Sequence, residues 1–235
     1  QQLEAATAEL RAANERLKEL DKMKDDFVST ISHEFRTPLT SIRSFSEIVH
    51  DNPDIPVEQR KKFLGTIVQE TERLTRLVND ILDLAKMEAG QTDWQLARIE
   101  PRKVIDNALA ATAGLFAKNP RIKLECRVAE DLPRILVDAD RITQVLVNLI
   151  SNAVKFCDKD NGLITIVGRA EAGSVLVSVR DNGVGIAKED HKKIFERFRQ
   201  AGDTLIGKPQ GTGLGLPISL HILERFGGTI WVESE

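Results

Sequence analysis

The chain has 235 residues, 41% of them hydrophobic and 29% charged, which is the balance of an ordinary globular protein of one or two domains. A net charge of -3, an aromatic share of 5% and the lack of tyrosine argue against a nucleic-acid partner, because such surfaces are basic and stack bases on aromatic rings. The two cysteines stand in no metal-ligand spacing, and no apolar run is long enough to span a bilayer. We therefore expect reduced thiols, a cytoplasmic location, either as a whole protein or as the cytoplasmic part of a longer, membrane-anchored one, and no membrane contact within this segment.

Residues 1–24 place leucine and alanine at alternating spacings of three and four, the pattern of a coiled-coil seam. No glycine or proline separates this segment from the stretch around His33, so we expect one helical rod that enters from an upstream module. A turn at residues 51–56, with two prolines, precedes a second long helix over residues 57–88. Two antiparallel helices with narrow stripes bury too little surface alone. This predicts that two hairpins pair as a four-helix bundle in a homodimer.

His33 lies on the wrong side of its predicted helix for packing. Five apolar residues form one stripe of that helix, namely Val28, Ile31, Phe35, Leu39 and Ile42. At about 100° per residue, His33 points roughly 140–160° away from this stripe, and Thr37 follows one turn later on the same face. The pattern predicts an imidazole displayed to solvent, with the Glu34 carboxylate beside it in sequence.

The pattern changes after a predicted hinge near Gly90, where helices and strands begin to alternate as in an α/β or α+β sandwich. The expected helices cover residues 101–118, 138–156 and 214–226, with a short helix near 188–198. The expected strands cover residues 121–128, 162–169, 174–180 and 229–232.

The helix expected at 138–156 carries a polar stripe at helical spacing, formed by Arg141, Gln144, Asn148, Asn152 and Lys155. A solvated face is the ordinary interpretation of such a stripe. Asparagine is a poor helix former, however, so two asparagines one turn apart in mid-helix indicate a function. Amide oxygens can ligate Mg²⁺, whose other ligands are waters and nucleotide phosphates, and Lys155 can offer its charge to phosphate.

Two glycine-containing segments follow. The segment Asp181-Asn182-Gly183-Val184-Gly185 comes directly after a predicted strand. It suits either a hairpin turn or a site in which Asp181 accepts a hydrogen bond from the exocyclic amine of adenine. The segment Gly211-Thr212-Gly213-Leu214-Gly215-Leu216 opens a helix, where backbone amides bind phosphate. It matches neither a dinucleotide-binding fingerprint, which needs a third small residue where Leu216 stands, nor a P-loop.

Together these segments resemble the boxes of sensor histidine kinases of two-component systems. The stretch Ser32-His33-Glu34-Phe35-Arg36-Thr37-Pro38-Leu39-Thr40 is similar to the H-box, and residues 148–156, 181–185, 195–198 and 211–216 are similar to the N, G1, F and G2 boxes. The resemblance covers about residues 21–235, and five boxes in the family's order and spacing make it specific. It implies an α+β two-domain fold, in which a helical hairpin forming a dimeric four-helix bundle precedes a two-layer α/β sandwich of the GHKL (Bergerat) ATP-binding type.

The resemblance also implies how the chain is divided. Residues 1–24 would be a coiled-coil signalling helix, 25–89 the dimerisation and histidine phosphotransfer (HisKA) domain, 90–97 a hinge, and 98–235 the catalytic ATP-binding domain without its last strand. Residues 188–210 would form a lid over ATP. The implied partners are a second copy of the chain, the receiver domain of a response regulator and an upstream sensor module.

In the chemistry that the resemblance implies, His33 attacks the γ-phosphorus of ATP and passes the phosphoryl group to an aspartate of a response regulator. Glu34 orients or deprotonates the imidazole, and Thr37 positions water to dephosphorylate the partner. Asn152, and with less support Asn148, would ligate Mg²⁺. The other nucleotide-binding residues implied are Lys155, Phe156, Asp181, Gly183, Gly185, Ile186, Phe195, Phe198, Gly211, Thr212, Gly213, Leu214, Gly215 and Leu216.

Two other classes of function compete with this one. A GHKL ATPase or chaperone-like module would hydrolyse ATP without a phosphohistidine, but it has no reason to display His33 and Glu34 on a dimer helix. A non-catalytic scaffold that dimerises and signals by shape would not need Asn152, Asp181 and the loop glycines. Labelling of the protein with phosphate from ATP distinguishes all three.

Overall fold

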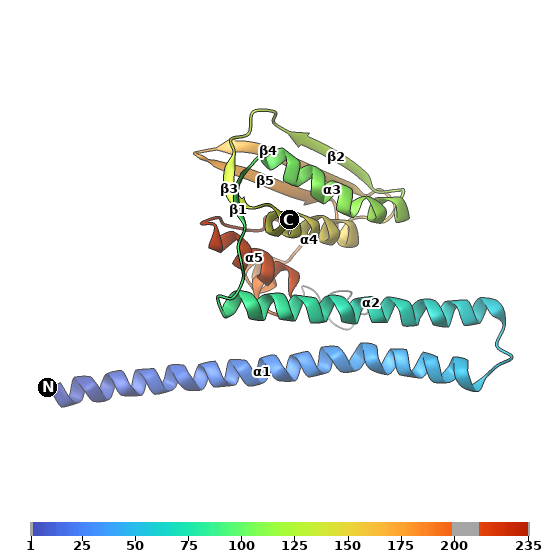
Figure 1. Cartoon of the computed structure of the whole chain (residues 1–235), viewed down its shortest axis with the longest axis horizontal. Helices are drawn as coiled ribbons and strands as arrows, with labels where there is room; N and C mark the ends of the chain where they lie inside the picture. Colours follow the sequence, from blue (N-terminus) through green and yellow to red (C-terminus); the bar gives the residue numbers. More distant parts are fainter. Residues whose placement is uncertain (1, 199–211, 235) are drawn as a thin grey trace. The chain divides into compact units, whose positions relative to one another are not determined.

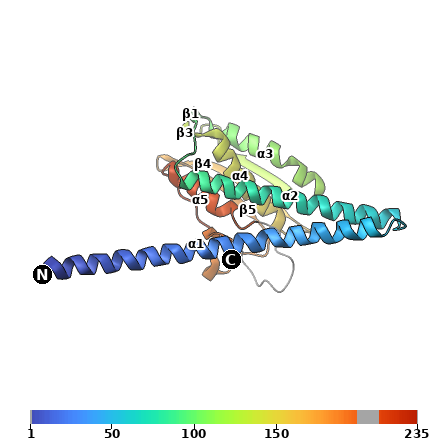
Figure 2. The same ribbon diagram turned by 60° about the horizontal axis from the view of Figure 1, so that its bottom comes forward.

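The computed structural model describes residues 2–198 and 212–234, and the chain forms two compact units, Gln1–Val78 and Asn79–Glu235. The first unit holds α1 (Gln2–Asp51) and most of α2 (Val57–Glu88), which run antiparallel as a hairpin (Figures 1 and 2). The second unit begins in the last turns of α2 and contains the sheets. The predicted rod is confirmed, because α1 runs uninterrupted through the stretch around His33.

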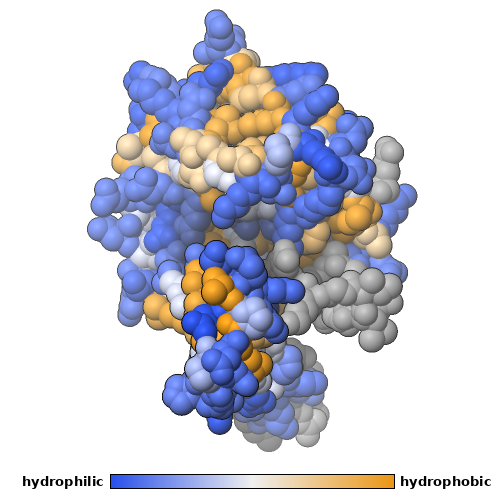
Figure 3. All heavy atoms as spheres, turned by 90° about the vertical axis from the view of Figure 1, so that its right-hand side faces the viewer, coloured by the Kyte–Doolittle hydropathy of each residue, from blue (hydrophilic) through white to orange (hydrophobic). Residues whose placement is uncertain are grey.

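The hairpin leaves apolar side chains at its own surface. α1 and α2 contact each other through the stacked rings of Phe45 and Phe63, whose centroids are 5.3 Å apart. Large apolar residues of this unit stay exposed all the same, namely Val28, Leu39, Ile48, Val57, Leu64, Val68 and Val78. Figure 3, a space-filling view, shows such side chains at the surface among polar ones. One hairpin therefore buries only part of its apolar surface, as the narrow stripes predict.

The second unit contains two sheets. The main sheet has the order β2 (Lys123–Val128), β4 (Leu163–Glu171) and β5 (Ser174–Asp181). β2 and β4 are parallel, and β4 and β5 are antiparallel. β1 (Leu96–Ile99) and β3 (Ile135–Asp138) form a separate antiparallel pair.

Helices cover one face of the main sheet, which gives the predicted two-layer sandwich (Figure 1). α3 (Pro101–Lys118) and α4 (Ala139–Phe156) pack on the sheet and on each other, and α5 (Gly215–Arg225) packs against α4. Two short 3-10 turns, η1 (Lys188–Asp190) and η2 (Lys193–Phe195), lie between β5 and α5 in the chain.

The core of this unit lies between the sheet and the two helices. Ile164 and Ile166 alternate along β4 and are at most 1% exposed, since alternate residues of a strand share a face. They belong to one buried cluster with Ala108 of α3 and Ile150 of α4, which are also at most 1% exposed. This core anchors α4, the helix that carries the predicted polar stripe.

α4 begins at a buried aspartate cap. The carboxylate of Asp138 accepts hydrogen bonds from the backbone amides of Asp140 and Arg141, which have no partner inside the helix. It also accepts one from the Gln95 amide, at 2.9 Å. Asp138 is only 6% exposed, so this one side chain joins the start of α4 to the segment before β1.

Two sequence-based expectations about elements need correction, and two strands were not predicted. The strand predicted at residues 229–232 is wrong: this segment has no strand assignment, and its neighbourhood is joined to the loop after β5 through the Ser234 hydroxyl, which accepts from the Ile186 amide. β-branched residues favour extended backbone, but a strand also needs a neighbour to pair with. The helix predicted near 188–198 is instead the two short 3-10 turns η1 and η2, and the second ends where Glu196 adopts an extended backbone. The paired strands β1 and β3 were not predicted, because four residues show too little alternation.

Candidate functional site

The predicted phosphoacceptor stretch lies on α1 as expected. The His33 side chain is 75% exposed, and that of Glu34 is 24% exposed. His33 Nδ1 and Glu34 Oε1 are 3.9 Å apart, so the carboxylate faces the Nδ1 side of the ring but is beyond hydrogen-bond distance. Thr37 lies one turn later, and its hydroxyl donates to the His33 carbonyl at 3.3 Å. Nε2 is therefore the ring nitrogen that Glu34 does not face.

The predicted polar stripe lies on α4, where two asparagine amides interact with each other and with α5. Asn148 donates to the buried Ser219 hydroxyl of α5 at 3.0 Å, and Ser219 in turn donates to the Gly215 carbonyl. Asn152 makes a longer contact, 3.5 Å, from its amide nitrogen to Asn148 Oδ1. Within the described residues, Asn152 Oδ1 accepts no hydrogen bond, which leaves this oxygen available to a ligand. Ser219 was missed from sequence, although it follows Gly215 by one helical turn.

The segment after β5 approaches the end of α4. Asp181 is exposed, and its Oδ1 accepts a hydrogen bond from the Gly183 amide at 2.9 Å. A Cβ at Gly183 would collide with the Phe156 carbonyl and come within 2.6 Å of Asp181 Oδ1. Gly185 has a φ of +73°, which favours glycine. Glycine is thus required at two positions of this segment for different reasons: at 183 it lets the backbone approach the Phe156 carbonyl, and at 185 it allows a left-handed backbone conformation.

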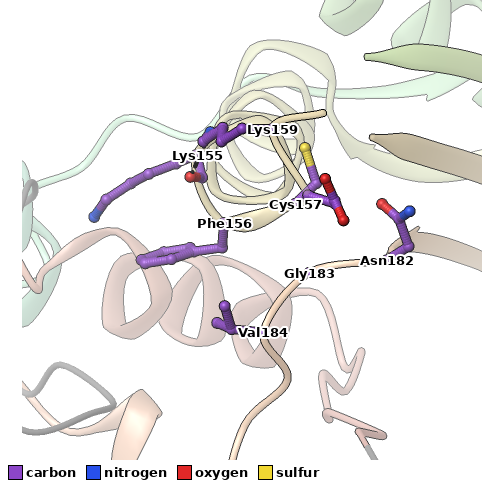
Figure 4. Close-up of a pocket in the computed structure, with 8 residues that line it drawn as sticks. Lys155, Phe156, Cys157, Lys159, Asn182, Gly183 and Val184 are labelled. Atoms are coloured by element: carbon purple, nitrogen blue, oxygen red, sulfur yellow. Dashed lines mark hydrogen bonds between the residues drawn. The ribbon is translucent and has the colours of Figure 1, made fainter. Parts of the chain in front are cut away.

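An open pocket of about 390 Å³ lies between these two segments. Residues 155–159 at the end of α4 and residues 182–184 line it (Figure 4). In Figure 4, the Phe156 ring lies on the side of Val184, and both are exposed apolar groups. The Lys155 ammonium lies 4.3 Å from the centre of the Phe156 ring. Cys157 is almost fully buried at the far side, and burial raises the pKa of its thiol. The flat apolar surface of Phe156 and Val184 suits the face of a purine base, and the neighbouring Asp181 carboxylate suits a hydrogen-bond donor on its edge.

The predicted phosphate loop opens α5 against the same helix. Gly213 has a φ of +68°, and Leu214 is fully buried. A Cβ at Gly215 would collide with Asn148 Oδ1, so this glycine lets the loop approach the asparagine stripe. Leu216 is half-buried in the first turn of α5. Gly211 and most of the predicted lid lie outside the described residues.

The F-box residues connect to the same loop. Phe195 ends η2, and the Phe198 amide donates to the Gly213 carbonyl at 3.0 Å. Ile186 is half-buried and is the loop residue whose amide meets Ser234. The structure therefore brings the N, G1, F and G2 segments together within the second unit, around the end of α4 and the start of α5.

Acidic residues in the last turns of α2, which belong to this second unit, also contact these segments. Asp83 accepts hydrogen bonds from Arg141 at 2.9 Å and Gln144 at 3.0 Å. Asp80 accepts one from the Thr212 hydroxyl at 2.7 Å, and Glu88 pairs with Arg197. These three acids were missed from sequence, because on α2 they look like an ordinary solvated face.

Among residues 2–198 and 212–234, no group of three or more His, Cys, Asp or Glu side chains forms a metal site. A cation at α4 would instead have amide oxygen available, above all Asn152 Oδ1, which suits a hard ion that retains waters and phosphate ligands. The residues present therefore fit Mg²⁺ held jointly with a nucleotide. Over the same described ranges, no helix combines the length and apolarity needed to cross a membrane.

Sequence comparison matches residues 23–90 to the His Kinase A (phospho-acceptor) domain family. It matches residues 137–235 to the histidine kinase-, DNA gyrase B- and HSP90-like ATPase family. The chain belongs to the sensor histidine kinases of two-component systems, as the five boxes predict, and carries the phosphoacceptor and ATPase domains of a protein-histidine kinase.

Individual relatives agree with this assignment. The chain is 40% identical over 228 residues to drug sensory protein A of Synechocystis sp., a match that covers 92% of this chain and 34% of that protein. Its structure is similar to histidine kinase ThkA in complex with response regulator protein TrrA, with a TM-score of 0.72 and 27% identity over 89% of this chain and 57% of that one. It is also similar to full-length ShkA in complex with AMPPNP, with a TM-score of 0.63 and 31% identity over 88% of this chain and 42% of that one.

Proposed function

We propose that this chain is a kinase core that autophosphorylates His33 with ATP and passes the phosphoryl group to an aspartate of a response regulator. The observation that carries the proposal is an imidazole 75% exposed on α1, with a carboxylate on its Nδ1 side, in a chain of this family. The AMPPNP complex of ShkA and the TrrA complex of ThkA support the nucleotide and the partner class.

The proposed transfer uses His33 Nε2 as nucleophile. The neutral imidazole, with its proton on Nδ1, forms a bond from Nε2 to the γ-phosphorus while the bond from that phosphorus to the β–γ bridging oxygen breaks. ADP then leaves. The Nδ1 proton passes to Glu34, whose Oε1 lies 3.9 Å away and needs only a small side-chain rotation to reach it. Phosphoryl transfer depends mainly on positioning and charge neutralisation, so an exposed histidine suffices as acceptor.

The second unit would bind the nucleotide through the segments around α4. Asp181 would accept from the adenine amine, with Phe156 against the base, and the backbone amides at the start of α5 would meet phosphate. Asn152, with Asn148 beside it, would hold Mg²⁺, which when bound neutralises phosphate charge. Lys155 would add a cation near the same phosphates.

Dimerisation is the second part of the proposal. The seven exposed apolar residues of the hairpin need a covering surface, and a second copy of the same hairpin supplies one in a four-helix bundle. The phosphoacceptor domain would then span residues 25–89, and the residues before it would transmit the state of an upstream sensor module. Sedimentation of the purified chain tests this directly, because a monomer at micromolar concentration would contradict it.

The test of the kinase activity is labelling with γ-labelled ATP and Mg²⁺. We expect an acid-labile, alkali-stable label that His33→Gln abolishes. His50→Gln is the matched control, because His50 is also exposed on α1 beside a carboxylate, with Nδ1 2.7 Å from Asp51 Oδ1. A label that survives His33→Gln would overturn the proposal. ATP hydrolysis without label would favour an ATPase module, and neither label nor hydrolysis would favour a scaffold.

Dephosphorylation of the regulator is a separate activity that we assign to Thr37. Its hydroxyl is exposed one turn from His33 and can leave the His33 carbonyl to position water. We expect Thr37→Ala to retain autophosphorylation and to lose dephosphorylation of the phosphorylated regulator. Equal loss of both activities in a purified assay would contradict this role.

A further inference from the structure

Arg73 of α2 contacts the carboxylate next to the phosphoacceptor. Its Nη2 donates to Glu34 Oε2 at 3.2 Å, and the two side chains are only 20% and 24% exposed. The other oxygen of the same carboxylate, Oε1, is the one that faces His33 Nδ1. The Glu34 carboxylate therefore lies between Arg73 and His33: its Oε2 accepts from Arg73, and its Oε1 faces His33 Nδ1.

A second carboxylate holds Arg73 in place. Glu70 lies one turn earlier on α2, with Oε2 at 3.9 Å from Arg73 Nη1. That oxygen is buried, and no described residue donates a hydrogen bond to it. A half-buried guanidinium between two carboxylates has little freedom, because moving it would leave buried negative charge uncompensated. Its planar fork can serve both carboxylates at once, which a lysine ammonium does less well.

We propose that Arg73 is a positioning residue for autophosphorylation, which acts through Glu34. By holding Oε2, it turns Oε1 toward Nδ1 of His33, so that the proton stays on Nδ1 and Nε2 is free to attack. This inference rests on the proposed function of His33 and Glu34 and adds to it a residue from the other helix of the hairpin. Without Arg73, the carboxylate can rotate toward solvent, and the imidazole loses its orienting partner.

The experiment is a single-turnover measurement of autophosphorylation at saturating ATP, in the intact chain. We expect Arg73→Met to slow labelling by about 10- to 100-fold, the size of effect that a misplaced catalytic group produces. Nucleotide affinity should stay unchanged. Arg73→Lys should recover part of the rate. Arg76→Met is the matched control, since Arg76 is an exposed arginine one turn further along α2, and it should retain the full rate.

A double-mutant cycle separates positioning from a structural role. In a Glu34→Gln background, Arg73→Met should slow labelling by less than about twofold, because the group it positions is already gone. The same fold loss in both backgrounds, or no loss in the parent chain, would overturn the inference. If Arg73→Met lowers helix content or dimerisation, Arg73→Lys replaces it in the cycle. The loss of labelling rate from Arg73→Lys should be smaller in the parent chain and absent in the Glu34→Gln background. Absence of label in the parent chain would instead reject the proposed function itself.

Discussion

The contact between Gly215 and Asn148 allows a quantitative prediction for Gly215→Ala. A Cβ added at Gly215 would collide with Asn148 Oδ1 and come within 2.8 Å of its Cγ. Asn148 is not free to move aside, because its amide donates at 3.0 Å to Ser219, a hydroxyl only 1% exposed. The methyl group can therefore enter only if this hydrogen bond breaks or the start of α5 moves away from α4.

The expected cost follows from these two contacts. Loss of one partly buried hydrogen bond costs about 1 kcal/mol, and an extra methyl in a packed contact costs about 1–3 kcal/mol. We expect Gly215→Ala to destabilise the second unit by about 2–4 kcal/mol. Both tryptophans of the chain, Trp94 and Trp231, belong to this unit, so urea unfolding followed by tryptophan fluorescence measures it apart from the hairpin.

Two further variants make this prediction refutable. In an Asn148→Ala background the obstructing amide is absent, so Gly215→Ala should then cost less than about 1 kcal/mol. Gly114→Ala is the matched control: apart from its chain neighbours and the backbone of its own helix, no described atom lies within 4 Å of its added Cβ in α3, and alanine should stabilise that helix by up to about 1 kcal/mol. An equal loss from Gly215→Ala in both backgrounds would show that Asn148 is not the obstacle, and the close approach of loop and stripe would lose its support.

Three other predictions concern the second unit. Asp138→Ala should lower the stability of the second unit by about 2–3 kcal/mol in the same fluorescence assay, because it removes the α4 cap and the hydrogen bond from the Gln95 amide. Asp138→Asn should keep most of this stability. Equal losses from the two variants would contradict the capping role. Burial raises the pKa of the folded Cys157 thiol above that of the unfolded chain, which is about 8.5, so the contribution of this thiol to folding stability is fully present below that pH and is lost as pH rises above it. Cys157→Ser should therefore flatten the decline of stability between about pH 8 and 10. An unchanged slope would refute this. Asp83→Ala removes the acceptor of two hydrogen bonds from α4, those of Arg141 and Gln144. It should speed amide hydrogen exchange in the last turns of α2 by roughly 5- to 30-fold. Unaltered exchange there would show that these hydrogen bonds do not stabilise the end of α2.

Local patterns in the sequence predicted most of the elements and the placement of the main site residues. The long helices were predicted closely because their apolar spacing repeats over many turns, and α3 matched its expected bounds because proline opens it. The same periodicity placed His33 away from the apolar stripe and aligned Asn148 with Asn152. The elements that were missed or wrong were short: β1, β3, the helix expected near 188–198 and the strand expected at 229–232. Strands in particular depend on a pairing neighbour more than on their own residues.

The sequence by itself therefore determined which side chains are displayed, since exposure on a helix follows from spacing along one chain. Tertiary structure decided which of those side chains meet. Glu34 and Arg73 are 39 residues apart, Asn148 and Ser219 are 71 apart, and Asp80 and Thr212 are 132 apart, so no local pattern relates the members of each pair. Such contacts depend on how whole helices pack, because the two members of each pair lie on different elements or loops. The functional boxes can consequently be recognised in the sequence, whereas the residues that hold them in position can be identified only from the tertiary structure.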